Sequence, residues 1–150
     1  MENNIKPRCI GYARISLAGM KTGRQTDKLS DVCDEIFIEK ISGAAKSRPV
    51  FDKIITNLQS GDTLIVLDLD RAFRSTIDAL LTMETLRERG VNLKILNLNL
   101  DLSTEFGEVI FGILATLAQF ERRMISRRTK EGLEAARKRG VKLGRPKKTY

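Results

Sequence analysis

The chain has 150 residues, with 27 Lys and Arg against 19 Asp and Glu, and is long enough for one domain with its own core. It contains no histidine, which excludes a histidine general base and histidine metal ligands. The two cysteines, Cys9 and Cys33, are too far apart in the sequence for a zinc-binding spacing, so we expect no metal and no cofactor. We expect reduced thiols and, without a signal peptide or a membrane-spanning stretch, a cytoplasmic protein with no membrane partner.

Apolar runs and helical patterns alternate along the first two thirds of the chain. Strands are predicted at residues 9–15, 35–39, 63–67 and 91–98, and helices at residues 22–33, 50–58 and 76–89. This alternation predicts an α/β fold, with a four- to five-stranded mostly parallel sheet flanked by helices. We expect this body to occupy residues 1–103.

Three of the predicted strands lead into polar residues. The first strand contains Arg14 and runs into Ser16, the second leads into a loop that closes at Arg48, and the third leads into the segment Asp70, Arg71 and Arg74. Residues just past the carboxyl ends of parallel strands line a shared crevice. We therefore expect one hydroxyl, one carboxylate and four guanidiniums to converge at one edge of the sheet.

These residue types suit attack on a phosphodiester. Arginine stays charged and presents a planar fork that matches phosphate oxygens, and several arginines would stabilise a pentavalent phosphoryl transition state. Positive charge would also stabilise the alkoxide of a serine nucleophile. Each residue has an ordinary structural alternative: Ser16 as a helix cap, Arg14 as a partner of Asp68 or Asp70, and Arg71 with Arg74 as a solvated helix face.

Positive charge is concentrated at the end of the chain. Residues 1–120 carry 15 Lys and Arg against 16 Asp and Glu, whereas residues 121–150 carry 12 against 3. A neutral body with a basic C-terminal arm is typical of proteins that bind DNA or RNA, although a solubilising tail would have the same composition.

A long helix is predicted over residues 104–139, with Gly140 ending it. Its first half is apolar nearly all round, through Val109, Ile110, Phe111, Ile113, Leu114, Leu117, Ala118 and Phe120. One small sheet covers only one side of such a helix, so we expect a homodimer, with either Phe111 or Leu114 facing the partner. The tail at residues 141–150, with Arg145, Lys147 and Lys148, is extended and cationic, which suits the A·T minor groove.

With these residues identified, the chain resembles the serine recombinases, the family of resolvases and DNA invertases, over essentially its whole length. The resemblance depends on several sequence blocks: Tyr12-Ala-Arg-Ile-Ser16, Glu39-Lys-Ile-Ser-Gly43 with Arg48-Pro49, Gly61-Asp-Thr-Leu, Leu69-Asp-Arg71 with Arg74, Ala118-Gln-Phe-Glu-Arg122 with Arg128-Thr129, and Gly144-Arg-Pro146.

The resemblance implies a site-specific recombinase in which Ser16 becomes linked to the 5′ phosphate of cleaved DNA. It further implies that Asp70 is a general acid for the leaving 3′ oxygen, and that the scissile phosphate is held by Arg14, Arg48, Arg71 and Arg74. The DNA contacts expected in addition are Tyr12, Gln25, Glu121, Arg122, Arg128, Arg145, Lys147 and Lys148. By resemblance, the partners are double-stranded DNA and copies of the chain, as a homodimer that assembles into a synaptic tetramer, with a possible accessory DNA-bending protein. A bacterial, archaeal, phage or mobile-element context also follows from the resemblance.

Several positions depart from the family pattern. Leu17, Met20 and Gly23 replace polar or acidic residues, and Asp68 stands where lysine is usual. The family normally continues from the Gly-Arg-Pro tail into a helix-turn-helix domain, and we expect no such DNA-recognition domain in this chain, which ends at Tyr150. Two hypotheses follow: a recombinase catalytic domain, or a catalytically silent module that oligomerises and binds the DNA backbone.

Overall fold

The computed structural model of the chain describes residues 6–15, 23–42, 45 and 47–145, without the side chains of residues 24 and 25. Its centre is a five-stranded sheet in the order β2-β1-β3-β4-β5. The strands are β1 (Cys9–Ile15), β2 (Glu35–Lys40), β3 (Thr63–Val66), β4 (Asn92–Ile95) and β5 (Leu100–Asp101). The first four are parallel, and β5 is antiparallel to β4, which confirms the predicted α/β fold with a mostly parallel sheet.

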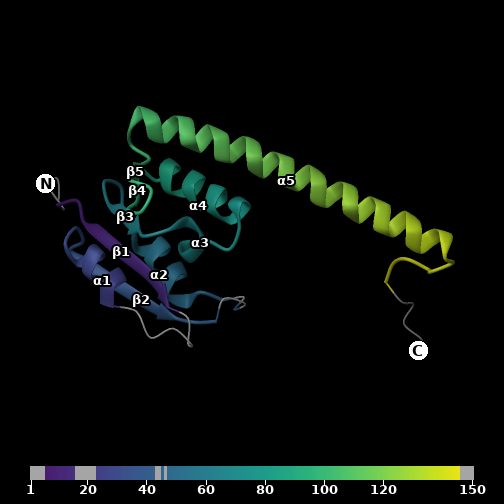
Figure 1. The fold of residues 1–150 in the computed structure, drawn as a ribbon, viewed down its shortest axis with the longest axis horizontal. Coiled ribbons are helices and arrows are strands. Elements are labelled where there is room, and N and C mark those ends of the chain that lie inside the picture. The colour runs from purple at the N-terminus through teal and green to yellow at the C-terminus, as the bar shows by residue number, and fades with distance from the viewer. Residues whose placement is uncertain (1–5, 16–22, 43–44, 46, 146–150) are drawn as a thin grey trace, which may run out of the picture.

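Helices cover both faces of this sheet. They are α1 (Gly23–Ser30), α2 (Pro49–Asn57), α3 (Leu69–Ala72), α4 (Thr76–Glu88) and α5 (Glu105–Lys138). The larger core lies on the side of α2 and α4, where Tyr12 of β1 packs with Phe51 and Met83. A smaller core forms on the other side, where Leu29 of α1 packs with Ala13 and Ile65. Figure 1 shows the sheet with these helices around it.

The long helix α5 contacts the rest of the chain through its first part. Figure 1 shows its first part beside α4 and its second part running clear of the other elements. Its 34 residues correspond to a rod of about 50 Å. The helix begins close to β5: a Cβ at Gly107 would lie 2.2 Å from the carbonyl oxygen of Asp101, so only glycine fits there. It ends before Gly140, which has φ +79 and closes the helix as predicted.

The apolar first half of α5 divides into two faces. Ile110, Phe111 and Leu114 pack against the main core. A separate row of side chains is exposed, and we call it the outer stripe: Phe106, Val109, Ile113, Leu117 and Phe120. Phe111 and Leu114, one of which was expected to face a partner, both contact the chain's own body and are partly buried there. Among the described residues of this half of α5, the outer stripe contains the exposed large apolar side chains.

The other differences from the sequence expectation are local. The strand predicted at 91–98 ends at Ile95, where a turn containing Asn99 (φ +47) reverses the chain into β5. The short helix α3 was not expected, and it separates Arg71 from the start of α4. In the part of the chain that the structure describes, no helix is both long and apolar enough to cross a membrane.

Candidate active site and DNA interface

The candidate active site lies where β1 and β3 end. The chain passes from β3 through Asp68 into α3, which carries Asp70 and Arg71, and Arg74 follows in the link to α4. Arg14, near the end of β1, reaches this segment: its Nη2 donates to the main-chain oxygen of Asp70 at 3.2 Å. The structure therefore places Arg14 against α3 through a carbonyl oxygen, and the carboxylate of Asp70 is exposed.

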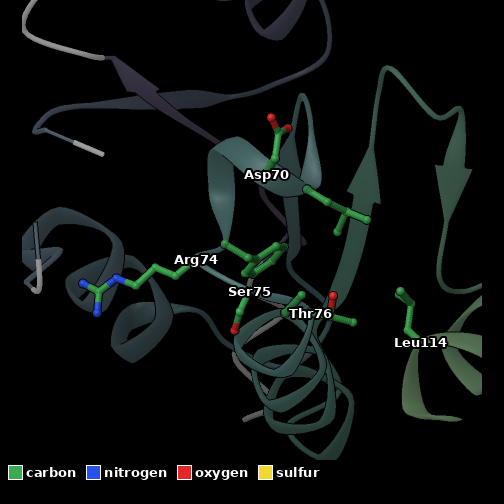
Figure 2. A pocket seen from close by; sticks show the side chains of 8 residues that line it. Asp70, Arg74, Ser75, Thr76 and Leu114 are labelled. Carbon is green, nitrogen blue, oxygen red and sulfur yellow. The ribbon is translucent and has the colours of Figure 1, made fainter. Parts of the chain in front are cut away.

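A cavity of about 300 Å³ adjoins this segment. Its wall is formed by α3, by the first turn of α4 and by Leu114 of α5. Figure 2 shows Asp70 and Arg74 on different sides of it, pointing in different directions, with Leu114 on a third side. The two polar side chains thus lie at the rim of a space whose remaining walls are largely apolar.

Arg71 is half exposed and lies beside an acidic residue. Its Nε is 3.8 Å from Oδ2 of Asp68. Asp68 also accepts a hydrogen bond from Nδ2 of Asn97 at 2.9 Å, and the Asn97 oxygen accepts from Lys28 at 3.1 Å. Asp68 is therefore held by its neighbours, and the Arg71 guanidinium remains accessible from solvent.

Arg48 is placed differently from the other predicted arginines. Arg48 is only 6% exposed. Its guanidinium carbon lies over the ring of Phe51, 4.4 Å from the ring centroid. Nη2 donates to Oδ2 of Asp78 at 2.9 Å, and Nη1 donates to the main-chain oxygen of Ala72. In this structure the hydrogen bonds of Arg48 go to protein groups, so it supports the α3–α4 segment and does not face solvent beside Arg74.

Tyr12, predicted as a DNA contact, is also buried. Its hydroxyl donates to Oε2 of Glu39 at 2.7 Å, and the two residues are 1% and 2% exposed. Glu39 accepts further hydrogen bonds from the N–H groups of Val50 and Phe51 at 2.9 and 3.4 Å, in the first turn of α2. Burial, reinforced by the hydrogen bond to Glu39, raises the pKa of Tyr12. The Tyr12 ring therefore does not reach the surface in this structure, and its hydroxyl is engaged by Glu39; a DNA contact by Tyr12 stays a prediction.

Two residues of this region were missed by the sequence reasoning, Glu39 and Asp78. Glu39 ends a strand-like run, where a charged residue is ordinarily solvated, and its burial depends on donors from α2. Asp78 follows Ser75 by three residues, a spacing typical of a helix start. That spacing was the available signal, but it does not indicate that Arg48 is a second partner.

The remaining predicted DNA contacts fall on α5 and beyond it. Glu121 is partly buried, and Arg122 and Arg128 are exposed in the second half of α5. Arg145 is exposed after the end of the helix. Ser16, Lys147 and Lys148 and the side chain of Gln25 lie outside the described residues.

The described residues include two cysteines and no metal-binding cluster. Among the described residues, no group of three or more His, Cys, Asp or Glu is arranged to hold a metal ion. Cys9 and Cys33 are free and partly buried. Burial raises the pKa of the Cys33 thiol to about 11, so it is protonated at neutral pH.

Comparison with known proteins gives a consistent result. The family model "Resolvase, N terminal domain" matches residues 9–142. The transposon Tn917 resolvase of Enterococcus faecalis is 41% identical over 140 residues, which cover 93% of this chain and 76% of that protein. The serine recombinase gin of Escherichia phage Mu is 40% identical over 140 residues, covering 93% of this chain and 72% of gin.

Solved structures show the same relationship. A resolvase family site-specific recombinase from Streptococcus pneumoniae superposes with a TM-score of 0.72 at 25% identity, over 88% of this chain and 99% of that one. The N-terminal catalytic domain of TP901-1 integrase superposes with a TM-score of 0.65 at 25% identity, over 77% and 97% of the two chains. The fold, the family model and the related sequences agree, and the chain belongs to the resolvase family of serine recombinases.

Proposed function

We propose that this chain is the catalytic domain of a site-specific DNA recombinase that cleaves and rejoins double-stranded DNA through a phosphoserine at Ser16. The observation that carries the proposal is the contact between Arg14, near the end of β1, and the main chain of Asp70, in the segment after β3 that also carries Arg71 and Arg74. Ser16 follows Arg14 by two residues in the sequence.

In the proposed reaction, the Oγ of Ser16 attacks the scissile phosphorus and releases its proton to solvent. The bond from phosphorus to the 3′ oxygen breaks, and Asp70 donates a proton to that oxygen. Arg14, Arg71 and Arg74 stabilise the negative charge that develops on the phosphoryl group. Attack by the 3′ hydroxyl of another strand on the phosphoserine reverses these steps, so rejoining needs no external energy source.

Arg48 is proposed to position other residues of the site. Its guanidinium is buried and bonded to Ala72 and Asp78, so we assign it to holding the α3–α4 segment and not to direct phosphate contact. Tyr12 likewise acts through Glu39 and the start of α2.

The proposed assembly is a homodimer that pairs into a tetramer on two DNA sites. The outer stripe supports the dimer, since the members of this row are between 44% and 63% exposed along one side of α5. Rows of this size on one helix are typical of protein–protein contacts. We propose a body at residues 1–103, a dimerisation and DNA-arm helix at residues 104–140, and a minor-groove tail at residues 141–150.

The second hypothesis, a silent module that binds DNA without cutting it, has less support. The departure at Asp68 adds a negative charge 3.8 Å from Arg71 and would weaken phosphate binding. Nevertheless, Arg71 keeps about half of its side chain accessible, and Arg14, Asp70 and Arg74 are all present at the same edge.

The test is formation of a covalent protein–DNA adduct. The chain is fused to a helix-turn-helix domain of known specificity and supplied with a DNA site nicked so that cleavage cannot reverse. Wild type is expected to give a denaturant-resistant adduct, and Ser16→Ala is expected to give none while still binding the DNA. Ser60→Ala, which changes an exposed serine in the turn before β3, serves as the control and should react like wild type. An adduct with Ser16→Ala would overturn the proposal.

A further inference from the structure

We infer that Asp78 is a positioning residue of the recombination reaction, acting together with Arg48 as a clamp on the segment that carries Asp70, Arg71 and Arg74. The inference rests on the proposed function. It adds a residue for which the sequence pattern indicated no role beyond helix capping.

One oxygen of Asp78 makes both contacts of the clamp. Oδ2 accepts from Nη2 of Arg48 at 2.9 Å and from the main-chain N–H of Arg74 at 2.9 Å. Arg48 lies 30 residues earlier in the chain, so the carboxylate joins the start of α4 to the start of α2. The position of the Arg74 backbone thereby depends on Asp78.

The guanidinium of Arg48 completes the clamp on the other side of the segment. While Nη2 contacts Asp78, Nη1 donates to the main-chain oxygen of Ala72, the last residue of α3. The planar fork of arginine therefore bridges the end of α3 and the first turn of α4. Residues 73–75, which include Arg74, lie between the two anchor points.

Arg48 is itself held in place from two directions. It packs over Phe51 at 4.4 Å from the ring centroid, and it is the residue that precedes α2. The first turn of α2 is fixed in turn by Glu39, which accepts from the N–H groups of Val50 and Phe51. Because the start of α2 is fixed in this way, Arg48 and Asp78 can hold the end of α3 and the backbone of Arg74 in one position.

The Asp78 contacts exceed what helix capping requires. Ser75 caps α4 by accepting from the N–H of Asp78 at 3.1 Å. In a common capping box the acidic side chain returns to the N–H of the cap residue. Here the carboxylate instead accepts from the N–H of Arg74, one residue earlier, and from the buried arginine that precedes α2. Catalytic groups must be held within fractions of an ångström, and this arrangement supplies that support to Arg74 and α3.

The experiment measures the rate of Ser16 adduct formation in the same fusion protein and nicked DNA. Asp78→Asn keeps the size of the side chain and one acceptor oxygen but removes the charge that Arg48 faces. We expect this variant to form the adduct at least about tenfold more slowly with unchanged DNA affinity. Asp52→Asn is the matched control: Asp52 is an exposed aspartate in the first turn of α2, and its change removes the same charge. It should react like wild type.

A double-mutant cycle with Arg48→Lys separates positioning from general destabilisation. If Asp78 acts through Arg48, adding Asp78→Asn to Arg48→Lys should slow the reaction little further, because the clamp is already broken. If Asp78 only stabilises α4, the two effects should multiply. Side-chain NMR of the Arg48 guanidinium tests the Arg48–Asp78 contact independently of the reaction rate. Rotation of the guanidinium group should be slow in wild type and in Asp52→Asn, and fast in Asp78→Asn.

Multiplying effects, or a rate for Asp78→Asn equal to that of Asp52→Asn, would overturn the inference while leaving the proposed function intact. Failure of the proposed function is distinguishable, because the wild-type fusion would then form no adduct. In that case the proposed role of Asp78 in recombination is also wrong, and the NMR result alone shows whether the Arg48–Asp78 contact exists.

Discussion

The hydroxyl of Tyr12 lies 2.7 Å from Oε2 of Glu39, and both side chains are almost completely buried. This hydrogen bond joins β1, the strand that carries Arg14, to β2. Glu39 extends the link to the first turn of α2 through the N–H groups of Val50 and Phe51. The scaffold of the active site therefore depends on a buried carboxylate that is kept satisfied by three donors.

Removing the Tyr12 hydroxyl should destabilise the protein. Tyr12→Phe leaves the buried Glu39 carboxylate with one donor fewer, which is expected to cost about 1–3 kcal/mol of unfolding free energy near neutral pH. Urea unfolding of the two proteins measures the difference. Equal stabilities would mean that the hydroxyl contributes nothing to the scaffold.

The same contact predicts a dependence on alkaline pH. The folded state raises the pKa of Tyr12 above its usual value of about 10, mainly through burial, so the unfolded chain loses the proton first. The contribution of the Tyr12 hydroxyl to the free energy of unfolding is therefore fully present below about pH 10. It is lost as the pH rises through the pKa that Tyr12 has in the folded state. Denaturant unfolding at rising pH should show wild type losing its advantage over Tyr12→Phe above about pH 10. A constant difference across that range would contradict the assignment.

Lysine is not expected to substitute functionally for the arginines at the site. Arg14→Lys, Arg71→Lys and Arg74→Lys are each expected to slow adduct formation by about tenfold or more, because the planar fork that matches a phosphate is lost while the charge remains. Arg48→Lys should also slow the reaction, through loss of its bridge between Ala72 and Asp78.

The control for the arginine series is Arg87→Lys, which changes a half-exposed arginine paired with Glu108 away from the site. It should react at the wild-type rate. Wild-type rates in all of the site variants would show that net charge alone matters there.

A charge in the outer stripe should prevent dimer formation. Ile113 is 57% exposed at the middle of the stripe, so Ile113→Glu would place a carboxylate in the proposed interface. We expect monomers by analytical ultracentrifugation and loss of DNA cleavage together. Gln119→Glu, at an exposed position of α5 off the stripe, should remain dimeric. A wild-type chain that is monomeric at high micromolar concentration would contradict this reading of α5.

The basic tail should contribute DNA affinity that depends strongly on salt. The affinity of a phosphate-dominated interface falls with salt in proportion to the number of phosphates it neutralises. Deleting residues 141–150 removes Lys142, Arg145, Lys147 and Lys148, and should flatten the slope of log affinity against log salt concentration. Circular dichroism should show an intact fold. An unchanged slope would mean that the tail does not touch DNA.

Sequence periodicity was sufficient for the main elements of the fold. The buried strands are short apolar runs, and α5 begins and ends close to the predicted limits because Thr104 caps it and Gly140 terminates it. The limits of β4 were not predictable in this way. Leu96 and Leu98 continue the apolar pattern, whereas the chain turns at Asn99 to bring β5 back beside β4.

The roles within the site depend on long-range partners that periodicity does not reveal. The positions of Arg14, Asp70, Arg71 and Arg74 near the ends of β1 and β3 were predictable, because strand ends can be read from apolar runs. The burial of Arg48 depends on its partner Asp78, 30 residues away, which no local pattern indicates. Similarly, the two faces of α5 were not separable until the position of the body against Ile110 and Leu114 was known.

The most direct measurement is to identify the amino acid that carries the DNA in the covalent adduct. Trypsin cuts after Arg14 and Lys21, which releases residues 15–21, a peptide whose only hydroxyl side chain is Ser16. After nuclease digestion of the adduct, mass spectrometry should find this peptide with a nucleotide attached through a 5′ phosphate. A nucleotide on any other peptide, such as one containing Ser42 or Ser75, would contradict the assignment of Ser16 as the nucleophile and with it the proposed mechanism.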